Sequence, residues 1–141
     1  MTDTAPDGKR SKAWAFAACV LGAALVAIVG MLALEGWIRH VARQAGESAM
    51  AAYGGERWDS LVKQAECSDC PMRERNRAVW ALGQMEERRA LPALKKHYTG
   101  EKCDHQAELC QYELDKAIRK IEGTWGLQGT LNRMARPHYA R

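Results

Sequence analysis

The sequence predicts an all-α protein, with one N-terminal transmembrane helix followed by a short helical domain. The first observation is an apolar run at 13–34, which contains no charged, Asn, Gln or Pro residue. The second is that apolar residues after this run recur at spacings of three and four, the period of an amphipathic helix. The third is that no stretch shows the alternating or β-branched pattern of a strand. Helices alone therefore account for the pattern.

The apolar run has the length of a membrane span. Its 22 residues would extend over about 33 Å as a helix, close to the ~30 Å hydrocarbon thickness of a bilayer. Trp14 and Trp37 stand at its two ends, and tryptophan favours the boundary between lipid and water. A cleavable signal peptide has a shorter apolar core of about 7–15 residues and a small-x-small cleavage site, which residues 35–38 do not offer. We therefore expect an uncleaved anchor in the lipid bilayer.

Charges beside the run predict its orientation. Lys9, Arg10 and Lys12 precede it, whereas Arg39 and Arg43 follow it. Because cytoplasmic flanks carry the excess of Lys and Arg, this count favours a cytoplasmic N-terminus. We therefore expect a single-pass protein of a bacterial inner (cytoplasmic) membrane, with the C-terminal domain in the periplasm.

Composition and turn residues divide the chain into five parts. The net charge is only +4, and the basic residues alternate with acidic ones, which argues against a nucleic-acid groove. The expected parts are a disordered cytoplasmic stub (1–12), the transmembrane helix (13–34), a helical stalk and hinge (35–55), the helical domain (56–123) and a basic tail (124–141). Gly46 is expected to interrupt the stalk, and Gly54 and Gly55 to end it.

Four amphipathic helices are predicted in the domain, at 56–66, 72–85, 89–98 and 105–122. Pro92 is compatible with a helix only in its opening turn. Gly100 and Gly123 are typical residues just past a helix end.

Two stretches of the domain resemble the HEAT-like repeats named after phycobilisome lyases. They are RAVWALGQM at 77–85 and RALPAL at 89–94. In those repeats a helix ending in Leu-Gly is followed by a turn and a second helix that opens with Ala-Leu-Pro-x-Leu. The matching residues here are Ala78, Leu82, Gly83, Ala90, Leu91, Pro92 and Leu94. The turn Glu-Glu-Arg departs from the usual Gly-Asp type.

The resemblance extends over about 56–122 and implies stacked helix pairs that bind another protein. The domain holds barely one and a half repeats, whereas about three are needed for a freestanding solenoid. Additional stabilisation is therefore expected, from cystines or from a partner.

Four cysteines of the domain form two close pairs in the sequence, Cys67 with Cys70 and Cys103 with Cys110. An even number in a small exported domain favours disulfides. Four cysteines can pair in three ways, and we favour the one in which Cys67 bonds to Cys70 and Cys103 bonds to Cys110. One alternative is a zinc site with Cys67, Cys70, Cys103 and either His105 or Cys110 as tetrahedral ligands. Another is a redox dithiol formed by Cys67 and Cys70.

No nucleophile motif or glycine-rich phosphate loop is present in the sequence, and we expect neither an enzyme nor a cofactor or small-molecule substrate. The favoured hypothesis is a scaffold, or an accessory subunit of a membrane complex, whose partner is a membrane protein. The predicted contact residues are Trp80, Leu91, Tyr98 and Tyr112, together with Arg133 and Arg136 in the basic tail. The alternative hypothesis is a membrane-tethered zinc-binding or thiol-redox module.

Overall fold

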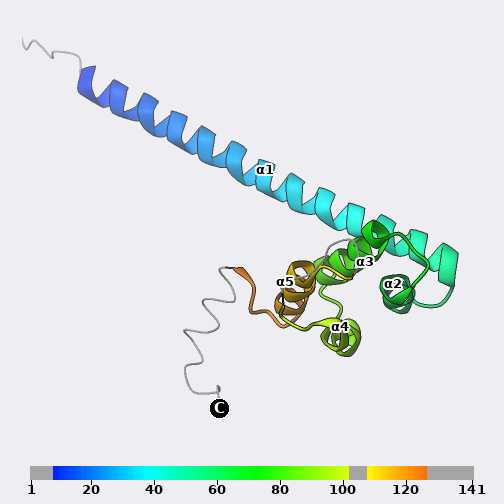
Figure 1. Cartoon of the computed structure of the whole chain (residues 1–141). Coiled ribbons are helices and arrows are strands. Elements are labelled where there is room, and N and C mark those ends of the chain that lie inside the picture. Colours follow the sequence, from blue (N-terminus) through cyan, green and yellow to red (C-terminus); the bar gives the residue numbers. More distant parts are fainter. Residues whose placement is uncertain (1–7, 102–107, 127–141) are drawn as a thin grey trace, which may run out of the picture. The chain divides into compact units, whose positions relative to one another are not determined.

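The computed structural model describes residues 8–101 and 108–126, with side chains from residue 14 onward. Within these ranges the chain is helical and has no strand, which confirms the all-α prediction (Figure 1). The elements are α1 (Gly8–Tyr53), α2 (Arg57–Glu66), α3 (Met72–Gln84), the 3-10 helix η1 (Arg88–Ala90), α4 (Leu91–His97) and α5 (Gln111–Ile121). The chain divides into two compact units, residues 1–37 and 38–141.

The first unit contains the apolar part of α1. Every side chain from Trp14 to Trp37 is exposed, and this stretch includes large apolar residues such as Phe16 and Leu25. By length and composition it is the one helix among the described residues that can cross a membrane. A continuous apolar surface of this size is stable in hydrocarbon and unfavourable in water.

The second unit begins within α1. Ala42, Ala45 and Ala49, which lie in the predicted stalk, are buried in the core of this unit. Small residues at this spacing let a helix pack closely on its neighbours. The last four turns of α1 therefore form part of the helical domain.

Gly46 does not interrupt α1, contrary to the expectation. The helix continues to Tyr53, and the stem of Arg57 packs against Gly46. A Cβ atom at position 46 would overlap Arg57 Cγ and lie 3.2 Å from Arg57 Nε. This glycine therefore gives space to a side chain, whereas Gly54 and Gly55 end the helix with φ of +66° and +89°, as predicted.

The core of the second unit is built around α3, which packs against both α2 and α5, while α4 packs against α5. The largest fully buried side chains include Leu61, Val79, Leu82 and Leu114. At Gly83 the backbones of two helices meet, because a Cβ atom built there would lie 2.8 Å from Ala117 Cα. Glycine at this position sets how closely α3 and α5 approach.

Three of the four predicted domain helices are found within one or two residues of their expected bounds. Pro92 lies in the opening turn of α4, as the sequence requires.

The fourth helix was predicted from residue 105 and begins only at Gln111; residues 108–110 are not helical, and residues 102–107 lie outside the described part. Two side chains hold this entry segment. Asn76 Oδ1 accepts a hydrogen bond of 2.9 Å from the Cys110 N–H, and Gln111 Oε1 accepts one of 2.8 Å from the Thr99 N–H. The segment therefore satisfies its backbone groups against α3 and the end of α4.

The contact at Gly83 predicts the effect of one added methyl group. Gly83→Ala should lower the free energy of unfolding by about 1–3 kcal/mol, because backbone atoms of Ala117 cannot move aside. Urea unfolding of the full-length protein in detergent micelles, followed by tryptophan fluorescence, would measure this loss. Gly36→Ala is the matched control, since Gly36 lies in a helix with no atom within 4 Å of the added Cβ. Equal stability of the two variants would contradict the close approach of α3 and α5.

Candidate functional site

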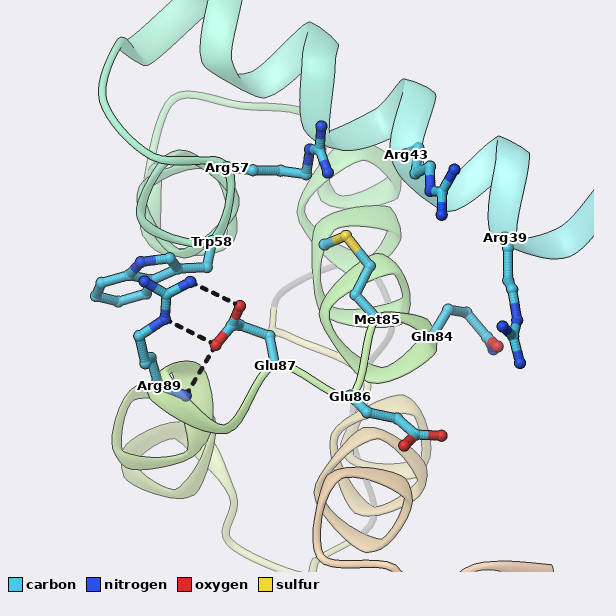
Figure 2. Close-up of a pocket in the computed structure, with 9 residues that line it drawn as sticks. All are labelled: Arg39, Arg43, Arg57, Trp58, Gln84, Met85, Glu86, Glu87 and Arg89. Atoms are coloured by element: carbon cyan, nitrogen blue, oxygen red, sulfur yellow. Dashed lines mark hydrogen bonds and ion pairs between the residues drawn. The ribbon is translucent and has the colours of Figure 1, made fainter.

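The second unit contains a cavity of about 440 Å³ that is rich in arginine (Figure 2). It is lined by Arg39, Arg43, Arg57, Trp58, Gln84, Met85, Glu86, Glu87 and Arg89. These residues come from α1, from the first turn of α2, from the end of α3 and from the turn into η1. The cavity therefore lies where several helix ends meet, and its volume is in the range of small-ligand sites.

Three of its arginines are unpaired within the described part of the chain. Arg39 and Arg43 are separated by one helical turn of α1, and both are exposed. Arg57 lies in the first turn of α2, and its stem packs beside Gly46 of α1. The Nε atom of Arg57 is buried from solvent and has no hydrogen-bond partner among the described residues. A buried donor without an acceptor is costly, by about 1–3 kcal/mol.

The fourth arginine, Arg89, is fully paired. Its Nε and Nη2 donate to the two carboxylate oxygens of Glu87 at 2.9 and 3.0 Å, and its Nη1 donates to Glu56 at 2.5 Å. The guanidinium also stacks on the Trp58 ring, 5.1 Å from the centroid. The bond from Arg89 holds the pKa of the Glu87 carboxyl below its ordinary value. Glu87 in turn raises the pKa of Arg89.

The pairing of Arg89 with Glu87 leaves an excess of positive charge in the cavity. The remaining lining charges are three cations, Arg39, Arg43 and Arg57, and one carboxylate, Glu86. Figure 2 shows Glu86 pointing away from the Arg89–Glu87 pair, below Gln84 and Arg39 in the view. The wall formed by α1 and the start of α2 is therefore suited to bind an anionic group.

Glu86 has an unusual backbone conformation, with φ of +51°. It follows the end of α3, where the Glu86 N–H donates to Gly83 O and the Glu87 N–H donates to Leu82 O, both at 3.3 Å. This is the Schellman arrangement, in which glycine is the usual residue. The equivalent turn after α5 has Gly123, with φ of +71°. A side chain in this left-handed region costs about 1–2 kcal/mol.

The helix pair α3–α4, with this turn between its helices, coincides with a known family pattern. Residues 74–99 match the model of the PBS lyase HEAT-like repeat. This chain contains a PBS lyase HEAT-like repeat. The match begins within α3 and ends just after α4, so the resemblance found in the sequence is confirmed over this stretch. No curated protein and no solved structure matches the chain.

The predicted contact residues of the HEAT-like domain differ in exposure. Tyr98 and Tyr112 are 40% and 61% exposed. Trp80 and Leu91 are partly buried and pack against the core. Arg133 and Arg136 lie outside the described residues. The structure therefore leaves the two tyrosines available for contact and gives Trp80 and Leu91 a packing role.

Tyr112 lies in α5 and Tyr98 lies beside it, both among charged groups. Tyr98 Oη donates to Asp115 at 3.4 Å. Lys116 Nζ lies 5.6 Å from the centre of the Tyr112 ring and 6.0 Å from that of Trp125. Tyrosine and tryptophan are enriched at protein-binding surfaces, and the cation is attracted to the faces of their rings.

Among the cysteines of the domain, Cys67 and Cys70 form a disulfide, as predicted. Tyr53 Oη lies 3.0 Å from Cys70 Sγ, which connects this loop to the end of α1. Cys110 is a buried free thiol at the start of α5, and Cys103 lies outside the described residues, so their pairing stays a prediction. Two sulfur atoms joined to each other offer no thiolate to zinc, and the described residues hold no group of three metal-ligating side chains.

Sequence reasoning did not identify the arginine-rich cavity. Arg39 and Arg43 entered only the count of flanking charges, and the interleaving of acidic and basic residues was used only to argue against a nucleic-acid groove. The four-residue spacing of these two arginines on a helix was the one available signal. Arg57 and Arg89 join them only through the fold.

The strain at Glu86 gives a test of the turn between α3 and α4. Glu86→Gly should raise the free energy of unfolding by about 1 kcal/mol, because glycine adopts positive φ without a Cβ clash. Gly123→Ala, at the equivalent turn, should lower it by a similar amount. Urea unfolding of the full-length variants in detergent measures both. Loss of stability in Glu86→Gly would show instead that the Glu86 side chain makes a contact worth more than the strain.

Proposed function

We propose that this protein is a single-pass membrane protein whose HEAT-like domain binds a partner membrane protein, as a scaffold or an accessory subunit of a complex. The observation that carries the proposal is the outer face of α5. In a helical repeat each helix pair covers the exposed face of its neighbour, and no described helix covers this face of α5. It presents Tyr112, which is 61% exposed, with the half-buried Lys116 beside its ring, so that apolar area and charge stand together.

A short repeat domain gains more from a partner than a long one. The described chain holds the pair α3–α4, with α2 before it and α5 after it, so a large part of its helix surface forms the boundary of the stack. Burial of the α5 face against another protein would supply the stabilisation that further repeats supply in a solenoid. This argument supports a stable complex over a brief encounter.

A binding role also fits the chemistry of the domain. Its charged residues form surface ion pairs, such as Lys95 with Glu122 at 2.6 Å, and its cavity is lined by arginine and glutamate. Such groups recognise charge and shape. We therefore propose that the protein is not an enzyme.

We propose further that the N-terminus lies in the cytoplasm and the domain in the periplasm of a bacterial cell. The exposed apolar stretch of α1 supports the membrane anchor. The Cys67–Cys70 disulfide supports an oxidising compartment, because cytosolic thiols are kept reduced.

Partner binding is tested by photo-crosslinking in intact membranes. A benzophenone amino acid at Tyr112 should form an adduct with one membrane protein, whereas the same probe at the exposed Ser48 of α1 should not. Tyr112→Ala with Lys116→Ala should reduce co-purification of that protein about tenfold, since central contact residues carry most of the binding energy. Adducts only with a second copy of the chain, or equal yields at both positions, would contradict the proposal.

Compartment and anchor retention are tested by the intact mass of membrane-extracted protein after alkylation. Reduction should expose two further thiols if only Cys67–Cys70 is oxidised, or four if Cys103 also pairs with Cys110. The mass should include residues 13–34, which would be missing from the protein if they were removed as a cleaved leader. Reduced thiols with stoichiometric zinc would overturn this topology and favour the alternative, a zinc-binding or thiol-redox module.

A further inference from the structure

We propose that the arginine-rich cavity binds the phosphate of an anionic phospholipid headgroup. The inference rests on the proposed membrane anchor and goes beyond it, because it assigns a lipid class and a binding site to the domain. Its basis is the wall formed by Arg39, Arg43 and Arg57, which have no acidic partner among the described residues.

The chemistry of this wall matches a phosphate group. A guanidinium presents parallel N–H donors that fit two phosphate oxygens at once. Arg57 Nε is buried and has no acceptor among the described residues, and its stem is held against Gly46. An anion in the cavity would offset the repulsion among the three cations.

Arg89 and Glu87, on the opposite wall, are held in place and leave the space beside the other three arginines open. Arg89 cannot swing into the cavity without breaking its two bonds to Glu87 and its bond to Glu56. Glu87 is engaged in the same way, so its carboxylate does not neutralise the other arginines. Met85 and Trp58 add apolar surface to the lining, with Trp58 beside Arg89. A ligand with one charged and one less polar part suits such a lining.

The membrane is the nearest source of phosphate. Arg39 follows Leu34, the last residue of the apolar run, by five positions. A chain of that length spans at most about 17 Å. Each headgroup layer is about 5–8 Å thick. If Leu34 lies at the edge of the hydrocarbon, Arg39 therefore lies within about 17 Å of that edge, near the headgroup phosphates.

The decisive experiment titrates full-length protein in dodecyl maltoside micelles with short-chain phosphatidylglycerol, followed by tryptophan fluorescence and native mass spectrometry. Short-chain phosphatidylcholine, inorganic phosphate and a hexaglutamate peptide are the comparison ligands. We expect saturable binding of phosphatidylglycerol at least tenfold tighter than of any comparison ligand.

Substitutions of the lining arginines test whether the lipid binds in the cavity. Arg39→Gln with Arg43→Gln should weaken it at least tenfold, and Arg57→Gln should do so separately, because each removes charge-assisted hydrogen bonds. Arg88→Gln is the matched control, since Arg88 is exposed, neighbours Arg89 and does not line the cavity. Arg39 and Arg43 are exposed, so their double variant should unfold at the same urea concentration as the original protein.

Each other outcome overturns the inference. Equal binding of phosphatidylcholine would make the interaction nonspecific, equal binding of inorganic phosphate would remove the lipid as the source, and preference for the acidic peptide would make the cavity a protein site. Unchanged binding in the arginine variants would place the lipid elsewhere. Failure of the anchor would instead appear as release of the protein from membranes by alkaline carbonate, a result independent of the titration.

Discussion

The approach of α3 to α5 at Gly83 determines how the rest of the domain is arranged. Backbone meets backbone there, because a Cβ atom at position 83 would lie 2.8 Å from Ala117 Cα. Alanines occupy neighbouring core positions, among them Ala78, Ala81 and Ala90. Helices that meet through such small residues pack at short distance and bury little apolar area per residue. The domain therefore has few large buried side chains, and polar contacts hold several of its segment ends.

Those polar contacts replace the usual helix caps. Neither α2, α3 nor α5 has a side-chain hydrogen bond at its N-cap residue. Ser60 is fully buried and its Oγ lies 2.7 Å from Gly54 O, and Arg75 Nε donates to Ala65 O at 2.9 Å. Gln111 connects the end of α4 to the start of α5. A buried polar group in a hydrogen bond fixes the position of a segment, because its loss leaves an unpaired donor or acceptor.

The same geometry separates two kinds of arginine in the cavity. Arg89 is held by Glu87, Glu56 and the Trp58 ring, and it serves to fix η1 against α2. Arg39, Arg43 and Arg57 have no such partner among the described residues, although the chain contains 17 acidic residues. Arg39 and Arg43 are exposed and free to pair with an anion, whereas Arg89 is already held, and this contrast is the physical basis for assigning the wall to binding and Arg89 to structure.

The sequence by itself determined the helical class, the apolar run and the HEAT-like helix pair, because these depend on local period, length and motif. It also identified where α1 ends and α4 begins, since Gly54 and Gly55 favour a break in a helix and Pro92 fits a helix only in its first turn. Only the tertiary structure decided that Gly46 makes room for Arg57, that α5 begins at Gln111 and that Trp80 packs inward. These depend on contacts between distant residues, as does the meeting of Arg39, Arg43, Arg57 and Arg89 around one cavity, which no spacing along the chain encodes.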